Sequence, residues 1–191
     1  GARLLAGGQS LLAALNMRLS SPELLIDITG IPGLAGITTG NGAVTIGALT
    51  THAEIESSPE IARTLPLLAA AAPHIAHVAI RNAGTFGGSL ALADPAAEWP
   101  ACCLALDASF VIANKSGSRK AKAREFFQAL YTTSLGPADV LTAIEIPLPA
   151  RGSRHAFVEL ARRRGDYAIV GVAAMATSTQ GTLTNVQLAY L

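Results

Sequence analysis

The residues best suited to chemistry lie in the segment RNAGTFGGSLALADPAAEWP, residues 81 to 100. Its glycines, Gly84, Gly87 and Gly88, allow positive φ values and a close approach of backbone to a ligand. Consecutive amides in such a turn form an anion-binding nest, to which Thr85 and Ser89 add hydroxyl donors. We therefore predict a phosphate-binding loop, while a glycine-rich turn between packed elements is an equal alternative. The predicted loop consists of Thr85, Phe86, Gly87, Gly88 and Ser89.

A second glycine loop follows the apolar run at residues 3 to 5 and precedes a helical pattern of leucines between Leu11 and Leu19. A junction of strand, glycine turn and helix directs free amides and the positive end of a helix dipole at one point, which suits a phosphate. Its spacing differs from the GxGxxG pattern of a Rossmann fingerprint. Two such loops suit a diphosphate held between two subdomains. The residues of this first loop are Ala6, Gly7, Gly8, Gln9 and Ser10.

The remaining pattern predicts mixed α/β organisation. Alternation and turn residues predict strands over residues 24–28, 34–39, 43–48, 110–113, 140–146, 156–161, 168–177 and 182–191, with Lys115 to Lys122 as a polar turn and edge. Gly40-Asn41-Gly42 predicts a hairpin turn between the second and third of these strands, and Gln180-Gly181 predicts a turn between the last two. Thr51 and Glu54 form a predicted capping box, and short helices follow to about residue 79. Asp94-Pro95 predicts an N-cap and first helical residue for a helix to about Leu106, and residues 125–130 look helical.

The cysteines, the paired histidines and the arginine run are predicted to have structural roles. Cys102 and Cys103 are the only cysteines, so they can build neither a disulfide framework nor a multi-cysteine metal site, and we predict buried thiols. His74 and His77 have a spacing compatible with metal binding, but no third ligand is evident nearby, so packing or capping is favoured. We predict no metal site. The Arg162–Arg164 run is predicted to be a solvated face.

Composition limits the function classes. A formal net charge of +1 provides no field for nucleic acid or an anionic membrane. With 50% hydrophobic residues, the 191-residue chain can bury a core of one or two domains. No uninterrupted apolar segment reaches the length of a membrane span. We therefore expect a soluble protein. Two cysteines without a disulfide framework suit a reducing compartment, so we expect it to be cytoplasmic.

Four motifs together resemble the FAD-binding medium subunit of the molybdenum hydroxylases, the family of xanthine dehydrogenase and carbon monoxide dehydrogenase. They are AGGQS at 6–10, IGALTTHAEI at 46–55, RNAGTFGGSLALADPAAE at 81–98 and RGDYAIVGVAA at 164–174. The resemblance implies a two-subdomain FAD-binding fold of the vanillyl-alcohol oxidase-like type. Residues 1–50 would form the N-terminal FAD-binding subdomain, 51–149 a second one with a mixed sheet, and 150–191 the start of a C-terminal α+β domain.

The resemblance also assigns roles to individual residues. The two glycine loops would hold the FAD diphosphate. Glu98 matches an acidic position near the adenosine, Leu141 an apolar residue packed on the cofactor, and Ile75 a position that is aromatic in xanthine dehydrogenases. Tyr167 matches an aromatic residue near the isoalloxazine, and we expect it to gate access to the flavin. Thr50, two residues before His52 in the second motif, is a further candidate flavin contact.

The implied function is electron transfer, with no catalytic acid, base or nucleophile in this chain. Substrate would be hydroxylated on a large molybdopterin subunit, and electrons would cross two [2Fe-2S] clusters of a small subunit to FAD here, then pass to NAD or another acceptor. A dimer of heterotrimers is expected. The chain is also expected to be a fragment, truncated at both ends, with weaker affinity for FAD than the full-length protein.

Three alternatives stay open. A hydrolase could use Ser89 or Ser10 with His52 and Asp94, although neither serine lies in a GxSxG elbow. A cofactor-free interaction module would use the glycine loops only as turns. A stand-alone flavin oxidase of the same fold would react with oxygen without partner subunits.

Overall fold

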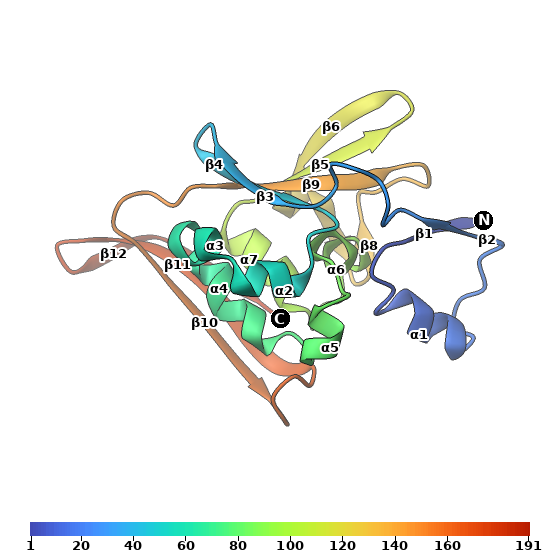
Figure 1. Cartoon of the computed structure of the whole chain (residues 1–191). Coiled ribbons are helices and arrows are strands. Elements are labelled where there is room, and N and C mark those ends of the chain that lie inside the picture. The colour runs from blue at the N-terminus through green and yellow to red at the C-terminus, as the bar shows by residue number, and fades with distance from the viewer.

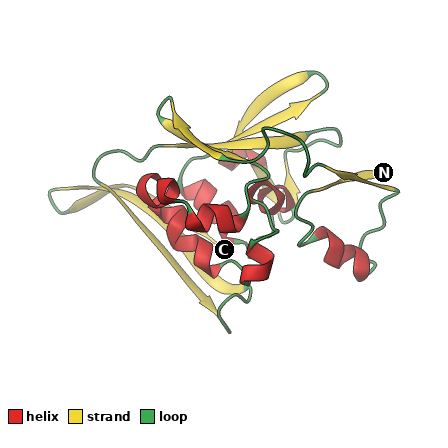
Figure 2. Cartoon of the chain, viewed as in Figure 1, coloured by secondary structure: helices red, strands yellow, loops and turns green.

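The computed structural model describes residues 1–191, in which a layer of helices lies between two antiparallel sheets (Figures 1 and 2). The strands are β1 (Ala2–Leu5), β2 (Leu24–Asp27), β3 (Ile37–Gly40), β4 (Ala43–Gly47), β5 (Ser109–Asn114), β6 (Gly117–Lys122), β7 (Phe127–Ala129), β8 (Thr132–Thr133), β9 (Val140–Pro147), β10 (Ser153–Ala161), β11 (Ala168–Thr179) and β12 (Thr182–Tyr190). The helices are α1 (Leu11–Asn16), α2 (His52–Ser57), α3 (Pro59–Thr64), α4 (Pro66–Ala71), the 3-10 turn η1 (Ala72–His74), α5 (Val78–Arg81), α6 (Phe86–Leu92), α7 (Glu98–Ala105) and α8 (Ala123–Phe126).

The larger sheet has the strand order β3-β4-β9-β5-β6, and all of its neighbours are antiparallel. Its first hairpin turns at Asn41 and Gly42, which both have positive φ, and pairs Gly40 with Ala43. This is the geometry that a two-residue Asn-Gly turn adopts, and it confirms the predicted hairpin. The predicted edge segment forms β6, the last strand of the sheet.

The smaller sheet, β10-β11-β12, closes the opposite side of the helix layer. Helix α7 packs on β11 and β12, and α4 packs on β10. The predicted turn at Gln180-Gly181 joins β11 to β12, and both residues have positive φ. The strands predicted over this part of the chain are confirmed with small shifts of their ends.

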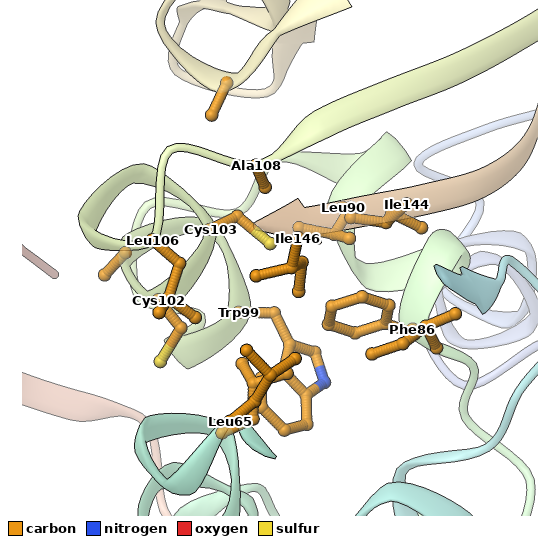
Figure 3. Close-up of a cluster of buried hydrophobic side chains, with 14 of the residues drawn as sticks. Leu65, Phe86, Leu90, Trp99, Cys102, Cys103, Leu106, Ala108, Ile144 and Ile146 are labelled. Carbon is orange, nitrogen blue, oxygen red and sulfur yellow. The ribbon is translucent and has the colours of Figure 1, made fainter. Parts of the chain in front are cut away.

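The core lies where the helices meet the two sheets. A cluster of thirty buried hydrophobic residues contains Trp99 and Phe86, whose rings pack edge to face at 5.2 Å. Figure 3 shows these two rings with Leu65 and the strand residues Ile144 and Ile146 around them. Cys102 and Cys103 are buried on the same helix, as predicted, and burial raises the pKa of both thiols. No helix is both long and apolar enough to cross a membrane.

The N-terminal unit stands at one edge of the molecule (Figure 1). Strands β1 and β2 pair in parallel, connected by α1, which ends at Asn16 because Arg18 takes a left-handed conformation with φ of 57°. The predicted helix to Leu19 is therefore too long. Strands β3 and β4 lie in the same sheet as β5, β6 and β9, and the division of the chain at residue 50 stays a prediction.

Two predicted helices have different boundaries. Asp94-Pro95 starts a turn, not the helix, and α7 begins at Glu98. In this turn the Asp94 carboxylate accepts from the amide of Ala96, and the main-chain carbonyl of Asp94 accepts from the amide of Ala97. The helix predicted over residues 125–130 becomes extended at Phe127. There the extended backbone lets neighbouring rings pack on Phe110, with Phe126 stacked at 4.0 Å and Phe127 edge-on at 5.4 Å.

Candidate functional site

The two glycine loops lie against each other. A Cβ atom on Gly7 would overlap the carbonyl oxygen of Ala83 and lie 3.0 Å from the Cα of Gly84. A Cβ on Gly88 would lie 3.9 Å from the Cβ of Ala6. The first loop can therefore rest directly on the backbone before and within the second only because position 7 is glycine.

The first loop carries free backbone donors. The main-chain N–H groups of residues 6 to 10 donate to no acceptor in the protein. Residues 6 to 8 are half-buried, and Gly8 has φ of 71°. Half-buried amides without partners are costly unless water or a ligand satisfies them. This loop can therefore bind an anionic group by backbone alone.

The second loop is built differently from the prediction. Four of its five amides are engaged, and two of them bind distant carbonyls: Phe86 N–H donates to Thr50 O and Gly87 N–H to Ala48 O, both at 2.8 Å. Thr85 is the N-cap of α6, and its hydroxyl accepts from Gly88 N–H at 3.1 Å. Consecutive free amides, which the predicted anion nest requires, are therefore absent from residues 86 to 89, because the segment after β4 and the cap and first turn of α6 use these donors.

The glycines of the second loop permit packing, not positive φ. None of Gly84, Gly87 and Gly88 has a positive φ, which corrects the prediction. A Cβ on Gly87 would overlap the Cβ of Ala48, so the start of α6 lies directly on the end of β4. Gly88 itself is exposed, and the Ser89 hydroxyl has no protein partner. Only this outer edge of the loop can meet a ligand.

Four predicted contact residues have buried side chains. Thr50 is 1% exposed, and its hydroxyl is shared between the amide and the carbonyl of Gly36. Phe86, Ile75 and Leu141 belong to the core cluster. Arg81 fixes the backbone at Ile75, because its guanidinium donates to the Ile75 carbonyl at 2.9 Å. These four side chains are at most 7% exposed and belong to the interior of the protein.

Glu98 and Tyr167 differ sharply in exposure. Glu98 begins α7 and is buried, and desolvation is the main reason that its pKa rises to about 7. Its own backbone amide opposes that rise, while Glu159 and Asp94 add to it. Tyr167 precedes β11 and is 74% exposed. It is thus accessible to a second molecule.

Tyr131 is a neighbour of this region that the sequence did not indicate. It lies beside Asp94, whose charge is the main cause of a raised pKa of the phenol, and Tyr167 contributes a smaller part. Its amide donates to the carbonyl of Ala93, and its φ is 53°. Left-handed backbone at a bulky residue is unusual, but nothing in the sequence around Tyr131 predicts it.

The structure gives no catalytic serine arrangement. The hydroxyls of Ser10 and Ser89 make no hydrogen bond to a histidine. His52 instead accepts a hydrogen bond at Nδ1 from Trp99, and desolvation, with a smaller effect of Arg81, lowers its pKa to about 4. Asp94 is engaged in its own turn. The hydrolase alternative is therefore contradicted.

The chain is similar in sequence to known flavin-binding subunits. The model of the FAD binding domain in molybdopterin dehydrogenase matches residues 1–149. The 6-hydroxypseudooxynicotine dehydrogenase complex subunit alpha of Paenarthrobacter nicotinovorans is 44% identical over the whole chain, which covers 64% of that protein. The carbon monoxide dehydrogenase medium chain of Hydrogenophaga pseudoflava is 40% identical over 98% of the chain and 66% of its own length.

Solved structures show the same similarity. A carbon monoxide dehydrogenase structure from Hydrogenophaga pseudoflava superposes with a TM-score of 0.97 at 41% identity. Quinoline 2-oxidoreductase from Pseudomonas putida 86 superposes with a TM-score of 0.93 at 40% identity. Each match covers 99% of this chain and 66% of the solved one. The chain thus spans about two thirds of the length of its relatives.

Proposed function

Because the chain belongs to the family of FAD-binding domains in molybdopterin dehydrogenases, we propose that it is the flavin-carrying, electron-transferring part of a molybdenum hydroxylase medium subunit. The protein is then an oxidoreductase subunit whose chemistry resides in its cofactor. The observation that carries this proposal is the direct contact between the two glycine loops, one of which has five consecutive free amides.

The residues present fit FAD. A diphosphate carries the negative charge and the acceptor oxygens that the free amides of residues 6 to 10 require. The Ser89 hydroxyl and exposed Gly88 offer a second edge on the other side of the same contact. In this proposal Glu98 lies toward the adenosine and Tyr167 at the isoalloxazine. Bound FAD supplies reversible uptake of one or two electrons.

The protein's own residues would position the cofactor and control access to it. Thr85 caps α6 and fixes the backbone of the second loop, while Arg81 fixes the segment at Ile75. Exposed Tyr167 would cover the reactive end and determine which acceptor reaches it. The buried side chains of Thr50, Phe86 and Leu141 would keep the floor of the site rigid.

The partner subunits are also part of the proposal. Electrons would arrive from a small [2Fe-2S] subunit, after hydroxylation on a large molybdopterin subunit, and leave to NAD or another acceptor. Relatives named as medium chains or medium subunits support an assembly of this kind. A cytoplasmic dimer of heterotrimers, with the chain divided at residues 50 and 149, completes the proposal.

The test is purification of the full-length protein followed by visible spectroscopy and titration with FAD. We expect a yellow protein, or a colourless one that takes up FAD stoichiometrically. A protein without flavin absorbance that binds no added FAD would contradict the proposal and favour a cofactor-free interaction module. Rapid reoxidation of the reduced flavin by oxygen, with no partner subunits recovered in pull-downs, would favour a stand-alone oxidase.

A further inference from the structure

Arg81, the last residue of α5, is the only lysine or arginine that is buried in this chain. A buried charge is unfavourable unless it is paired and hydrogen-bonded. The counter-charge comes from Glu56 on α2, whose Oε2 accepts a hydrogen bond from Nε of Arg81 at 2.7 Å. A planar guanidinium that is held at one edge has a fixed direction for its other donors. Arg81 can therefore fix the position of whatever else it binds.

The other donors of Arg81 hold a tight turn after η1. Nη1 donates to two consecutive main-chain carbonyls, that of Ile75 at 2.9 Å and that of Ala76 at 3.0 Å. Ala76 has φ of 42°, a left-handed conformation that is unfavourable for a residue with a Cβ atom. The hydrogen bonds stabilise this conformation, because both carbonyls must be directed at one nitrogen. The direction of the Ala76 carbonyl therefore depends on Arg81.

The connection between β10 and β11 lies directly on that carbonyl. A Cβ atom on Gly165 would be 2.6 Å from the carbonyl oxygen of Ala76 and 3.0 Å from Nδ1 of His77. Gly165 also has φ of 84°, so this position requires glycine both for its conformation and for the close approach. Gly165 and the Ala76 carbonyl are thus in direct contact, although they lie far apart in sequence.

Tyr167 follows this contact by two residues. Its side chain is 74% exposed, so few neighbours hold the ring, and the backbone of the connection determines where the ring lies. The residue between them, Asp166, closes a turn with Arg163: its amide donates to the Arg163 carbonyl, and its carboxylate accepts from the Arg163 Nε, both at 3.1 Å. The placement of this turn is set where Gly165 meets Ala76.

We propose that Arg81 is a positioning residue for Tyr167. Held by Glu56, the guanidinium fixes the Ala76 carbonyl, and this carbonyl holds Gly165 and the connection that leads into Tyr167. The same nitrogen binds the Ile75 carbonyl, so one side chain sets the backbone of two predicted cofactor contacts. That Tyr167 stands at the flavin rests on the proposed function, whereas the contacts from Glu56 to Gly165 do not.

A lysine at position 81 separates this role from simple charge pairing. Its ammonium group can still pair with Glu56, but it lacks the planar fork that reaches a carboxylate and two carbonyls together. Arg81→Lys should therefore keep the ion pair and loosen the connection in part. Arg81→Met, which has a side chain of similar length without charge or donors, should loosen it fully.

The experiment is limited proteolysis of the full-length protein by trypsin, with the cleavage positions identified by mass spectrometry. It requires no cofactor. The Arg162–Arg164 run is exposed, as predicted, and lies in the connection, so cleavage there reports its local opening. Arg151, in the exposed turn before β10, is the internal reference, because it lies at the other end of that strand.

Gly165→Ala tests the same contact without altering the buried guanidinium, so a folding defect of Arg81→Met does not decide the outcome. Its matched control is Gly181→Ala in the turn between β11 and β12. Gly181 has φ of 83°, close to the 84° of Gly165, but a Cβ atom there meets nothing within 4 Å. The two variants therefore share the backbone strain and differ in the collision with Ala76.

We expect cleavage at Arg162–Arg164, relative to cleavage at Arg151, to rise about fivefold in Arg81→Met and Gly165→Ala, as loss of one or two hydrogen bonds would produce. The rise should be smaller in Arg81→Lys, and Gly181→Ala should match the wild type. An unchanged ratio in Arg81→Met or Gly165→Ala would overturn the proposal. So would equal increases at both positions, which would show general loosening of the fold.

A second measurement separates this proposal from the proposed function. In FAD-saturated protein, the reduced flavin of Arg81→Met and Gly165→Ala should react with oxygen faster than that of Gly181→Ala, followed by stopped-flow absorbance. Raised cleavage with unchanged oxygen reactivity would support the positioning of Tyr167 by Arg81 and contradict Tyr167 as the gate. Faster oxidation without raised cleavage would overturn the positioning role.

Discussion

Trp99 donates a hydrogen bond from its indole Nε1 to Nδ1 of His52 over 2.9 Å, in the interior of the protein. The contact joins the start of α2 to α7. A Cβ on Gly84 would lie 2.8 Å from Nε2 of the same imidazole, and the amide of His52 donates to the Gly84 carbonyl. One neutral histidine therefore links the core helix to the second glycine loop.

Protonation of His52 should be visible in the fluorescence of Trp99, the only tryptophan of the chain. Nδ1 can accept from the indole only when it is unprotonated, and desolvation lowers the pKa of His52 from 6.5 to about 4. We expect the emission to change with a midpoint near pH 4, while circular dichroism reports whether the fold persists.

His52→Asn is the matched variant, because its amide oxygen can replace Nδ1 as acceptor without titrating. In this variant the change of Trp99 emission near pH 4 should disappear. His155→Asn, at an exposed histidine of β10, should leave it unchanged. A midpoint that survives in His52→Asn would show that another group controls the emission.

Glu98 and His52 should have opposite effects on the pH dependence of stability. The folded pKa of Glu98 is raised to about 7, so its contribution is full below pH 4.5 and is lost as pH rises toward 7. The folded pKa of His52 is lowered to about 4, so its contribution is present above pH 6.5 and is lost as pH falls. Each amounts to at most about 3 kcal/mol, and they oppose each other between pH 4.5 and 6.5.

Glu98→Gln should therefore expose the effect of His52. The free energy of unfolding of this variant should rise with pH between pH 4.5 and 6.5, whereas that of the wild type should change less. Urea unfolding at a series of pH values measures this. Glu23→Gln, at an exposed glutamate, is the control. A Glu98→Gln profile parallel to the wild type would contradict the assignment.

Gly7→Ala should weaken FAD binding more than it destabilises the fold. The added methyl group would overlap Ala83 O and push the two loops apart. We expect at least a tenfold increase in the FAD dissociation constant by flavin fluorescence titration. Gly30→Ala, where a Cβ meets nothing within 4 Å, should bind FAD like the wild type. Equal affinity in both variants would contradict the role of the loop contact.

Gly87→Ala should act on stability itself. Its Cβ would overlap Ala48 at the buried junction of α6 and β4, and overpacking of this kind costs about 1–3 kcal/mol. Chemical denaturation of the FAD-free protein is the measurement, again with Gly30→Ala as the control. An unchanged midpoint would mean that the junction can relax.

Tyr167→Ala should change the reactivity of the flavin and leave the fold intact. The side chain is 74% exposed, so we expect a change of less than about 0.5 kcal/mol in the free energy of unfolding. Removing the ring should speed the reaction of reduced flavin with oxygen, followed by stopped-flow absorbance. Tyr190→Ala, at a tyrosine of similar exposure on β12, should match the wild type. Identical rates in all three proteins would exclude a gating role.

Much of the local structure was predictable because it depends on short-range chemistry. Asn41-Gly42 forms the predicted hairpin turn, since both residues tolerate positive φ. Thr51 and Glu54 form the predicted capping box with reciprocal hydrogen bonds. The resemblance carried by the four motifs is confirmed by the family match over residues 1–149 and by relatives that match 98–100% of the chain, and the mixed α/β fold is confirmed by the solved structures.

Errors arose where distant segments decide a local conformation. The predicted turn at Gly87 and Gly88 is the first turn of α6, because Ala48 and Thr50 accept its first amides and Thr85 caps it. Phe127 leaves the predicted helix because its ring packs on Phe110. Ala48, Thr50 and Phe110 all lie far along the chain from the segments whose conformation they fix.

The sequence alone determined the turn residues, the caps, the apolar segments and the two glycine loops, because residue type and spacing govern backbone preference locally. Only the tertiary structure decided what those glycines do. Gly7 and Gly87 are required for contacts with residues far along the chain. The run of free donors is that of the first loop, whereas four of the five amides of the second loop are satisfied within the protein.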